Sequence, residues 1–192
     1  MESIILASAS PRRRELLSQI GINYEVKPSK KEEVITKQLP SEVVMELAKQ
    51  KAEDIVKKVN IVDKIILGAD TIVSKDGEVM GKPKTEAEAY GMLSKLQDAT
   101  HQVYTGVSLS YLSDKGEIVS HVFFEETKVK VYPMTDEEIL EYIATGSCMD
   151  KAGSYGIQDG FAAYIKGIEG DYNNVVGLPV GRVYQELKNI LK

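Results

Sequence analysis

The segment Ser8–Arg14 combines hydroxyl and guanidinium side chains in an order that suits phosphate binding. It holds two serines, one proline and three arginines, directly after the apolar run Ile4–Ala7. That run is typical of a buried strand, and Ser10-Pro11 is typical of a helix start, with serine as the N-cap and proline in the first turn. Free N–H groups and the helix dipole favour an anion there. The alternative is a capped helix whose arginines are simply solvated, but cations at a helix N-terminus oppose the dipole. We therefore interpret the segment as an anion site.

A lysine stands inside the apolar face of the helix that we expect from Ser41 onward. Lys51 lies four residues after Leu47 and four before Ile55, so the three side chains share one face. Lysine is rarely buried without a partner, although its stem can cover apolar surface while its ammonium group stays in water. We favour a role for Lys51 in a site over this second interpretation.

Asp70 is the one acidic residue within the apolar run Ile65–Val73. We expect this strand to be interrupted at Gly68–Thr71, which would place Asp70 at a strand end, where α/β sheets commonly bind ligands. A carboxylate among apolar residues loses hydration and therefore needs partners. Asp70 can bind Mg²⁺ or orient a water molecule, and the alternative is an aspartate that only shapes a turn.

Two charged loops are further candidates for the site around Asp70. In isolation, Glu32-Glu33 and the segment Gly81–Thr85, which contains Lys82, each indicate a solvated loop. Within reach of Asp70, however, the two glutamates would complete a site for a hard cation.

A glycine-rich region completes the set of candidate segments. Asp150–Gln158 and Asn173–Pro179 place glycines among polar residues. Glycine lets a backbone approach a ligand closely, and Gln158 offers both the donor and the acceptor that reading a nucleobase edge requires. Structural turns would explain the glycines but not their clustering with polar groups.

The overall charge and the missing motifs limit the function classes. The chain has 24 Lys and Arg against 29 Asp and Glu, a net charge of −5, so we expect no polynucleotide partner, because such binding depends on neutralising phosphates. A local group of cations can still hold a small polyanion. The sequence has neither a Walker A loop nor a dinucleotide glycine fingerprint, and no His/Cys cluster suits zinc. We expect His101, His121 and Cys148 to be structural.

The sequence gives no sign of secretion or membrane insertion. A single cysteine cannot form an internal disulfide. The start Met1–Ile4 does not resemble a signal peptide, and no apolar stretch is long enough to span a bilayer. We expect a cytoplasmic protein with no membrane partner.

Hydrophobic periodicity predicts alternating strands and helices in a single domain over residues 1–192. Strands are expected at 4–7, 23–26, 65–73, 103–111, 118–132 and 161–168, with the fourth and fifth forming a hairpin. Helices are expected from residues 10, 41, 85, 135 and 179, with capping boxes at Thr85/Glu88 and Thr135/Glu138. The fold class is therefore α/β with a mixed sheet.

Six of these segments, in this order, resemble the Maf family of nucleotide pyrophosphatases, and the resemblance covers nearly the whole chain. It implies a two-lobed α/β fold related to the inosine triphosphate pyrophosphatases, with a mixed twisted sheet, flanking helices and a central cleft. It also implies the reaction, in which water attacks the α-phosphorus of a nucleoside triphosphate and pyrophosphate leaves. The matching segments are Leu6–Arg13, Gly68–Val73, Gly81–Pro83, Asp150–Gly153, Gly156–Gln158 and Asn174–Pro179.

The resemblance implies roles for nine side chains. Catalysis would involve Asp70, Lys51 and Lys82, and the metal, Mg²⁺ or Mn²⁺, would be held by Glu33 and Asp70. Whether Asp70 binds the metal or takes a proton from water stays open. The set Arg12, Thr71 and Gln158 looks like that of the subgroup that hydrolyses dTTP and UTP. Substrate binding is assigned to Ser8, Arg12, Arg13, Thr71 and Gln158.

The sequence departs from the family pattern at two places near Gln158. Ser147-Cys148-Met149 stands where Glu-Pro-Leu is common, and Asp159 stands where glycine is usual. These departures concern base selectivity rather than phosphate chemistry. Two alternatives remain: a pyrophosphatase of the inosine/xanthosine type, and a nucleotide-binding regulator of cell division or septum formation. The resemblance also suggests a homodimer.

Overall fold

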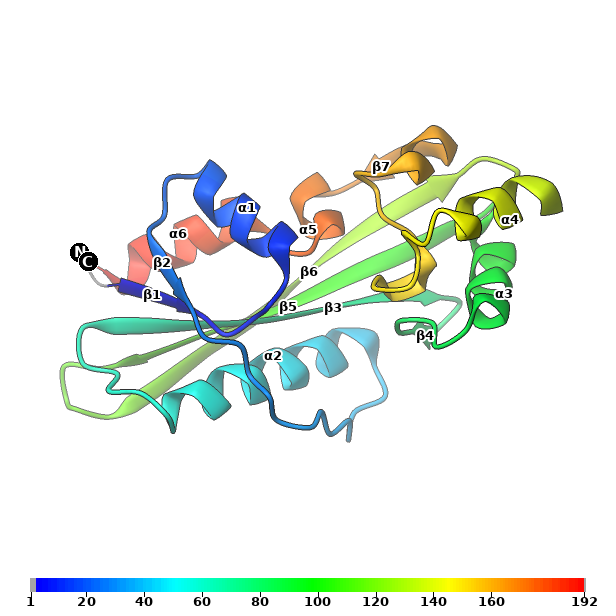
Figure 1. The fold of residues 1–192 in the computed structure, drawn as a ribbon. Coiled ribbons are helices and arrows are strands. Elements are labelled where there is room, and N and C mark those ends of the chain that lie inside the picture. Colours follow the sequence, from blue (N-terminus) through cyan, green and yellow to red (C-terminus); the bar gives the residue numbers. More distant parts are fainter. Residues whose placement is uncertain (1–2, 192) are drawn as a thin grey trace.

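The computed structural model describes residues 3–191, so Met1 and Glu2, on which part of the signal-peptide expectation falls, lie outside it (Figure 1). Seven strands form one sheet: β1 (Ser3–Leu6), β2 (Tyr24–Val26), β3 (Lys64–Lys75), β4 (Glu78–Met80), β5 (Thr100–Leu112), β6 (Ile118–Val131) and β7 (Ile165–Glu169). The α-helices are α1 (Pro11–Gln19), α2 (Pro40–Val56), α3 (Glu86–Leu96), α4 (Asp136–Ala144), α5 (Tyr172–Val176) and α6 (Val180–Ile190). Two 3₁₀ helices are η1 (Ala152–Ser154) and η2 (Gly160–Tyr164).

The sheet is mixed, as predicted. Its strand order is β2-β1-β3-β5-β6-β7, and β4 pairs with β3. β1 runs parallel to β2 and β3, whereas the other pairs are antiparallel. β5 and β6 form the expected hairpin, and β1, α1 and β2 form a parallel unit with a helical crossover.

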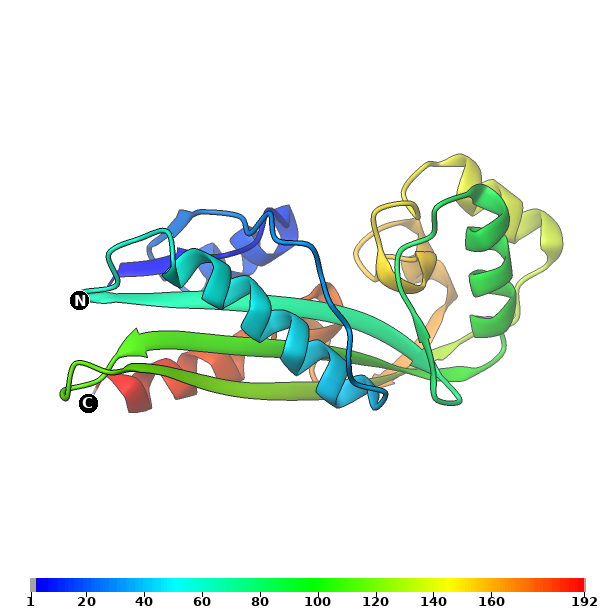
Figure 2. The same cartoon turned by 90° about the horizontal axis from the view of Figure 1, so that it is seen from below.

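The helices gather in two groups around the long strands β3, β5 and β6. Figure 2 shows α1, α2 and α6 along one half of these strands and α3 and α4 at the other end. This arrangement agrees with the expected two lobes. No helix within residues 3–191 combines the length and hydrophobicity needed to cross a membrane.

Alternate residues of β3 face different layers of the core, as the two-residue period of a strand requires. Leu67 packs in the large cluster that includes α1, α3, α4 and α6, whereas Ile66 packs against α2. Continuing this alternation, Asp70 faces α2 together with Ile72, and Thr71 faces the opposite layer.

Two glycines let α2 lie directly on the sheet. A Cβ atom added to Gly68 would stand 2.2 Å from the carbonyl oxygen of Ala48, and one added to Gly106 would stand 2.2 Å from that of Val44. Both distances are far below van der Waals contact, so only glycine fits at either position. The close approach brings Lys51 of α2 within reach of Asp70.

The structure corrects several predicted elements. β3 is not interrupted at Gly68–Thr71, because each of these residues pairs with β5 and the backbone hydrogen bonds carry the strand through. The last strand begins at Ile165 rather than Phe161, because the Asp159 side chain accepts a hydrogen bond from the Phe161 amide and starts η2 instead.

The predicted helix caps are partly correct. Thr135 and Glu138 form a full capping box. Thr85 caps the Glu88 amide as expected, but the Glu88 carboxylate accepts from the amide of Lys84 rather than from that of Thr85. Only half of that predicted box is therefore present.

Candidate active site

A pocket of about 1170 Å³ opens at the edge of β3, between the end of β1 and the end of β4. β1 pairs with residues 64–67 of β3, and β4 pairs with residues 73–75. Within the described chain, residues 68–72 therefore pair with β5 alone. The gap lets side chains from both faces of β3 reach one opening.

The nine side chains selected from the sequence all line this pocket, although they come from six separate parts of the chain. Their convergence in space is a finding of the structure, whereas their individual roles stay predictions. They are Ser8, Arg12, Arg13, Glu33, Lys51, Asp70, Thr71, Lys82 and Gln158.

Two carboxylates meet at the ammonium group of Lys51. Its Nζ atom lies 2.8 Å from Glu33 Oε1 and forms an ion pair with Asp70 Oδ1. The side chains of Lys51 and Asp70 are only 19% and 13% exposed. Since a charge in such surroundings needs a partner, the partners of Lys51 explain why a lysine is tolerated on the apolar face of α2.

The loop that carries Glu33 is tied along α2. Ser29 donates to Asp54 at 2.8 Å, and the Thr36 amide donates to Glu46 at 2.9 Å. Between them, Gln50 accepts from the Val34 amide at 3.1 Å and donates to the Val34 carbonyl oxygen at 2.6 Å. The three helix residues are spaced four apart and so share one side of α2. These contacts hold Glu33 at the pocket, although the loop lacks secondary structure of its own.

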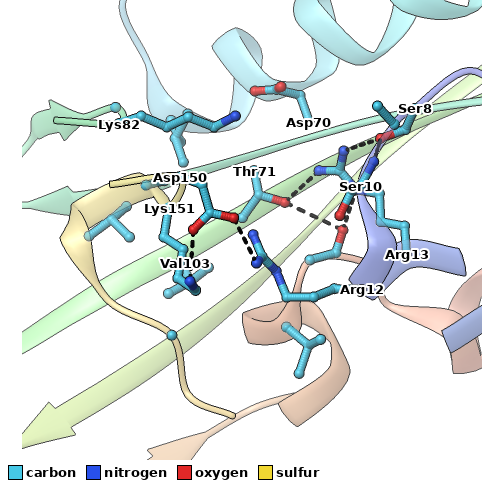
Figure 3. A pocket seen from close by; sticks show the side chains of 18 of the residues that line it. Ser8, Ser10, Arg12, Arg13, Asp70, Thr71, Lys82, Val103, Asp150 and Lys151 are labelled. Atoms are coloured by element: carbon cyan, nitrogen blue, oxygen red, sulfur yellow. Dashed lines mark hydrogen bonds and ion pairs between the residues drawn. The ribbon is translucent and has the colours of Figure 1, made fainter. Parts of the chain in front are cut away.

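Arg13 is held by three acceptors from three parts of the chain. Its Nε donates to the carbonyl oxygen of Gly177 at 2.8 Å, Nη1 to Ser8 Oγ at 3.0 Å, and Nη2 to Thr71 Oγ1 at 3.0 Å (Figure 3). Burial lowers the pKa of Arg13, while the negative charge of Asp70 acts in the opposite direction. The guanidinium group is thus fixed in orientation, with its charge close to the pocket.

The N-terminus of α1 faces the same space without a side-chain cap. Ser10 occupies the N-cap position as predicted, but its hydroxyl makes no capping hydrogen bond. Within residues 3–191, the backbone N–H groups of Arg12 and Arg13 donate to no carbonyl oxygen, whereas Arg14 donates to Ser10. Uncapped N–H groups at a helix start are available to an anion.

A chain of alternating charges lies across the pocket from Asp70. Arg12 Nη1 lies 3.3 Å from Asp150 Oδ2, and Asp150 Oδ1 lies 2.7 Å from Lys151 Nζ. Burial acts to raise the pKa of Asp150, but Lys151 and Arg12 outweigh it and lower that pKa. The sequence marked Asp150 and Lys151 only as members of a glycine-rich region, because Arg12, the partner of Asp150 in the first helix, is 138 residues away.

The remaining predicted side chains differ in how available they are to a ligand: Thr71 is already hydrogen-bonded, whereas Gln158 and Lys82 are exposed. The Thr71 hydroxyl is already engaged by Arg13 and by Thr105 at 2.9 Å, so it supports Arg13 from inside the pocket wall. Gln158 and Lys82 are exposed. Lys82 points toward Asp70 (Figure 3), and within the described residues it forms no ion pair. It is therefore a cation available to a ligand.

The residues expected to be structural are buried or paired. His101 is fully buried, its Nε2 atom lies 2.7 Å from the Tyr155 hydroxyl, and burial lowers its pKa to about 4. His121 contacts Glu186 at 3.0 Å. Cys148 is buried, and burial raises the pKa of its thiol. A neutral histidine and a protonated thiol in these positions suit packing rather than catalysis.

Comparisons with known proteins show which proteins this chain is similar to. A family model described as "Maf-like protein" matches residues 3–190. The dTTP/UTP pyrophosphatase of Agathobacter rectalis is 52% identical to this chain, and the alignment covers 99% of the chain and 98% of that relative. The dTTP/UTP pyrophosphatase of Lachnoclostridium phytofermentans is 50% identical, with 98% and 95% covered. Among solved structures, a HAM1 protein from Coxiella burnetii has a TM-score of 0.46 at 16% identity, over 68% of this chain and 73% of that chain.

Proposed function

The chain belongs to the Maf-like protein family, and on this premise we propose that it hydrolyses dTTP and UTP to the nucleoside monophosphate and pyrophosphate. One observation carries the proposal. The pocket beside β3 brings arginine and lysine side chains from separate segments around two carboxylates and an uncapped helix start. A triphosphate needs such a cationic cradle, and its hydrolysis needs an acidic group beside it.

The donor set of the site fits a hard divalent cation, Mg²⁺ or Mn²⁺. Glu33 Oε1 and Asp70 Oδ1 both contact the ammonium group of Lys51, so the two carboxylates lie close together. No cluster of three or more His, Cys, Asp or Glu side chains that could hold a metal occurs within residues 3–191. Two carboxylates together with substrate phosphates form the type of site that magnesium commonly uses. When bound, the cation would neutralise negative charge that develops on the phosphates.

The side chains of the pocket have distinct tasks in the proposed reaction. Arg13 is already oriented, so little reorganisation is needed for its remaining N–H groups to face a phosphate. Lys82 and the free N–H groups of α1 bind phosphate oxygens from two further directions. Asp70 either takes a proton from the attacking water or helps to hold the cation. Both alternatives place the attack at the α-phosphorus and release pyrophosphate.

Base selectivity is assigned to the part of the pocket around Gln158. Its amide can pair with the donor and acceptor edge of uracil or thymine. A site whose polar group must be hydrogen-bonded by the substrate disfavours a base that leaves that group unpaired. The exposed position of Gln158 on the pocket wall leaves its amide free to meet a ligand.

A panel of nucleoside triphosphates tests the proposed function. With Mg²⁺ or Mn²⁺ present, we expect dTTP and UTP to give the highest kcat/KM, with pyrophosphate rather than orthophosphate as product. The measurement is product release from dTTP, UTP, CTP, ATP, GTP and ITP by the purified protein. Preference for ITP would instead indicate the inosine/xanthosine type, and nucleotide binding without pyrophosphate release would indicate a regulator.

Two further properties are part of the proposal. A cytoplasmic location is supported by the single, buried Cys148, since a reducing compartment preserves a free thiol. A homodimer is supported by the family resemblance alone.

A further inference from the structure

Gln158 is presented by a tight turn of residues 156–159. The Asp159 amide donates to the Gly156 carbonyl oxygen at 3.4 Å, which closes the turn and leaves Gln158 at its third position. The turn lies in the pocket wall, and Gln158 is exposed there. The orientation of its amide therefore depends on whatever holds the two ends of the turn.

The carboxylate of Asp159 anchors the last residue of the turn to three other residues. It accepts hydrogen bonds from Ser147 Oγ at 2.5 Å, from the Tyr142 hydroxyl at 3.1 and 3.2 Å, and from the Phe161 amide at 3.0 Å. The Tyr142 hydroxyl in turn accepts from the Gly156 amide at 3.2 Å. The pair Tyr142–Asp159 thus connects the first and last residues of the turn.

The protonation state of Tyr142 suits this connection. Burial, followed by the negative charge of Asp159, raises the pKa of Tyr142. The hydroxyl therefore stays a donor to Asp159 while it accepts from Gly156. A hydrogen bond to a charged acceptor is stronger than one between neutral groups.

Gly156 shows how closely the support is packed. A Cβ atom added there would lie 2.6 Å from Asp159 Oδ2 and 2.7 Å from Lys151 Cε. The carboxylate and the lysine stem therefore lie directly against the start of the turn, and no larger residue fits without moving them.

The same support continues to the phosphate side of the pocket. Lys151 Nζ lies 3.7 Å from Asp159 Oδ2 and 2.7 Å from Asp150 Oδ1, and Asp150 contacts Arg12. Figure 3 shows Asp150 between Lys151 and Arg12. The turn that carries Gln158 is thereby joined through charged side chains to the start of α1.

We propose that Asp159 is a specificity-determining positioning residue, which fixes Gln158 at the place where a pyrimidine edge is read. The proposal rests on the proposed function, because it assigns the selectivity of the same pocket. The Asp159 carboxylate is occupied by Ser147, Tyr142 and the Phe161 amide, so it acts through Gln158 rather than on the reacting phosphorus.

Steady-state kinetics of Asp159→Ala with UTP and CTP tests this inference. We expect the ratio of kcat/KM for UTP to that for CTP to fall by about 10- to 100-fold, because a displaced Gln158 amide no longer discriminates between the two bases. The loss should appear in KM for UTP, with kcat changed by less than about threefold, since the contact is made equally in ground and transition states. Ser147→Ala removes the hydrogen bond from Ser147 Oγ to Asp159, and Tyr142→Phe removes the hydroxyl that donates to Asp159 and accepts from the Gly156 amide. Each variant leaves Asp159 in place, so each should shift the ratio in the same direction by less.

Asp136→Ala is the matched control, because Asp136 also accepts from a tyrosine hydroxyl, that of Tyr90 at 2.8 Å, but lies outside the pocket lining. It should leave the UTP/CTP ratio unchanged. If Asp159→Ala does not fold, Ser147→Ala and Tyr142→Phe carry the test. Folded variants that all keep the wild-type ratio would overturn this inference alone, whereas a wild-type protein that releases no pyrophosphate from UTP would overturn the proposed function and this inference with it.

Discussion

Replacing Asp70 by asparagine is expected to lower kcat for UTP by about 10²- to 10⁴-fold, the range associated with loss of a general base. Asparagine preserves the size and shape of the side chain but removes the negative charge and the ability to accept a proton. Lys51 would keep Glu33 as a partner at 2.8 Å, so we expect the fold to persist. Pyrophosphate release at saturating UTP measures the effect, and thermal unfolding checks the fold.

Asp76→Asn is the matched control for this variant. Asp76 also pairs with a lysine, Lys75, at 2.6 Å, but its side chain is 83% exposed and lies outside the pocket. Its left-handed backbone conformation, with φ of 51°, also suits asparagine. Turnover should therefore match the wild type. Wild-type kcat in folded Asp70→Asn would remove Asp70 from the mechanism.

Replacing Arg13 by lysine is expected to damage both stability and turnover, although the charge is kept. Arg13 is buried, and its planar guanidinium donates to Ser8, Thr71 and the Gly177 carbonyl oxygen at once. A single ammonium group cannot occupy all three positions. Each buried acceptor left unpaired costs about 1–3 kcal/mol, so we expect the free energy of unfolding to fall by about 2–4 kcal/mol. Denaturant unfolding measures this loss, and kcat/KM for UTP should fall with it.

Arg14→Lys separates this effect from a general change in α1. Arg14 is the next residue of the same helix, its side chain makes no hydrogen bond within the described chain, and it does not line the pocket. Both stability and kcat/KM should stay at wild-type values. An Arg13→Lys protein as stable and active as Arg14→Lys would show that the three hydrogen bonds are dispensable.

Much of the candidate site was predictable from residue type and position alone. Ser8 and Arg13 follow an apolar strand and open a helix, and Lys51 stands out on an apolar helix face. Each is unusual against its local pattern, and each lines the pocket. Local chemistry therefore identified these residues without knowledge of their partners.

The position of Asp70 was harder to predict, because it depends on neighbouring strands. The sequence suggested a break at Gly68–Thr71, but β3 continues through it. Asp70 reaches the pocket because, on one edge of β3, the pairing with β1 stops at Leu67 and the pairing with β4 covers only Val73 onward. The lengths of strands distant in sequence set that gap, so no local pattern reveals it.

The contacts that position the site residues also could not be predicted from the sequence. Ser147 and Asp159 stood out only as departures from the family pattern, yet in the structure they share a hydrogen bond. The loop that carries Glu33 shows no periodicity, and its place is set by three polar side chains of α2. Such contacts arise from the tertiary fold, where residues of unremarkable local type become partners.

The site of bond cleavage tests the central claim, attack of water on the α-phosphorus within this pocket, most directly. UTP would be hydrolysed by the purified protein in ¹⁸O-labelled water, and the products would be examined by mass spectrometry. We expect one labelled oxygen in UMP and none in pyrophosphate. Label in pyrophosphate, or release of orthophosphate with UDP, would contradict the claim.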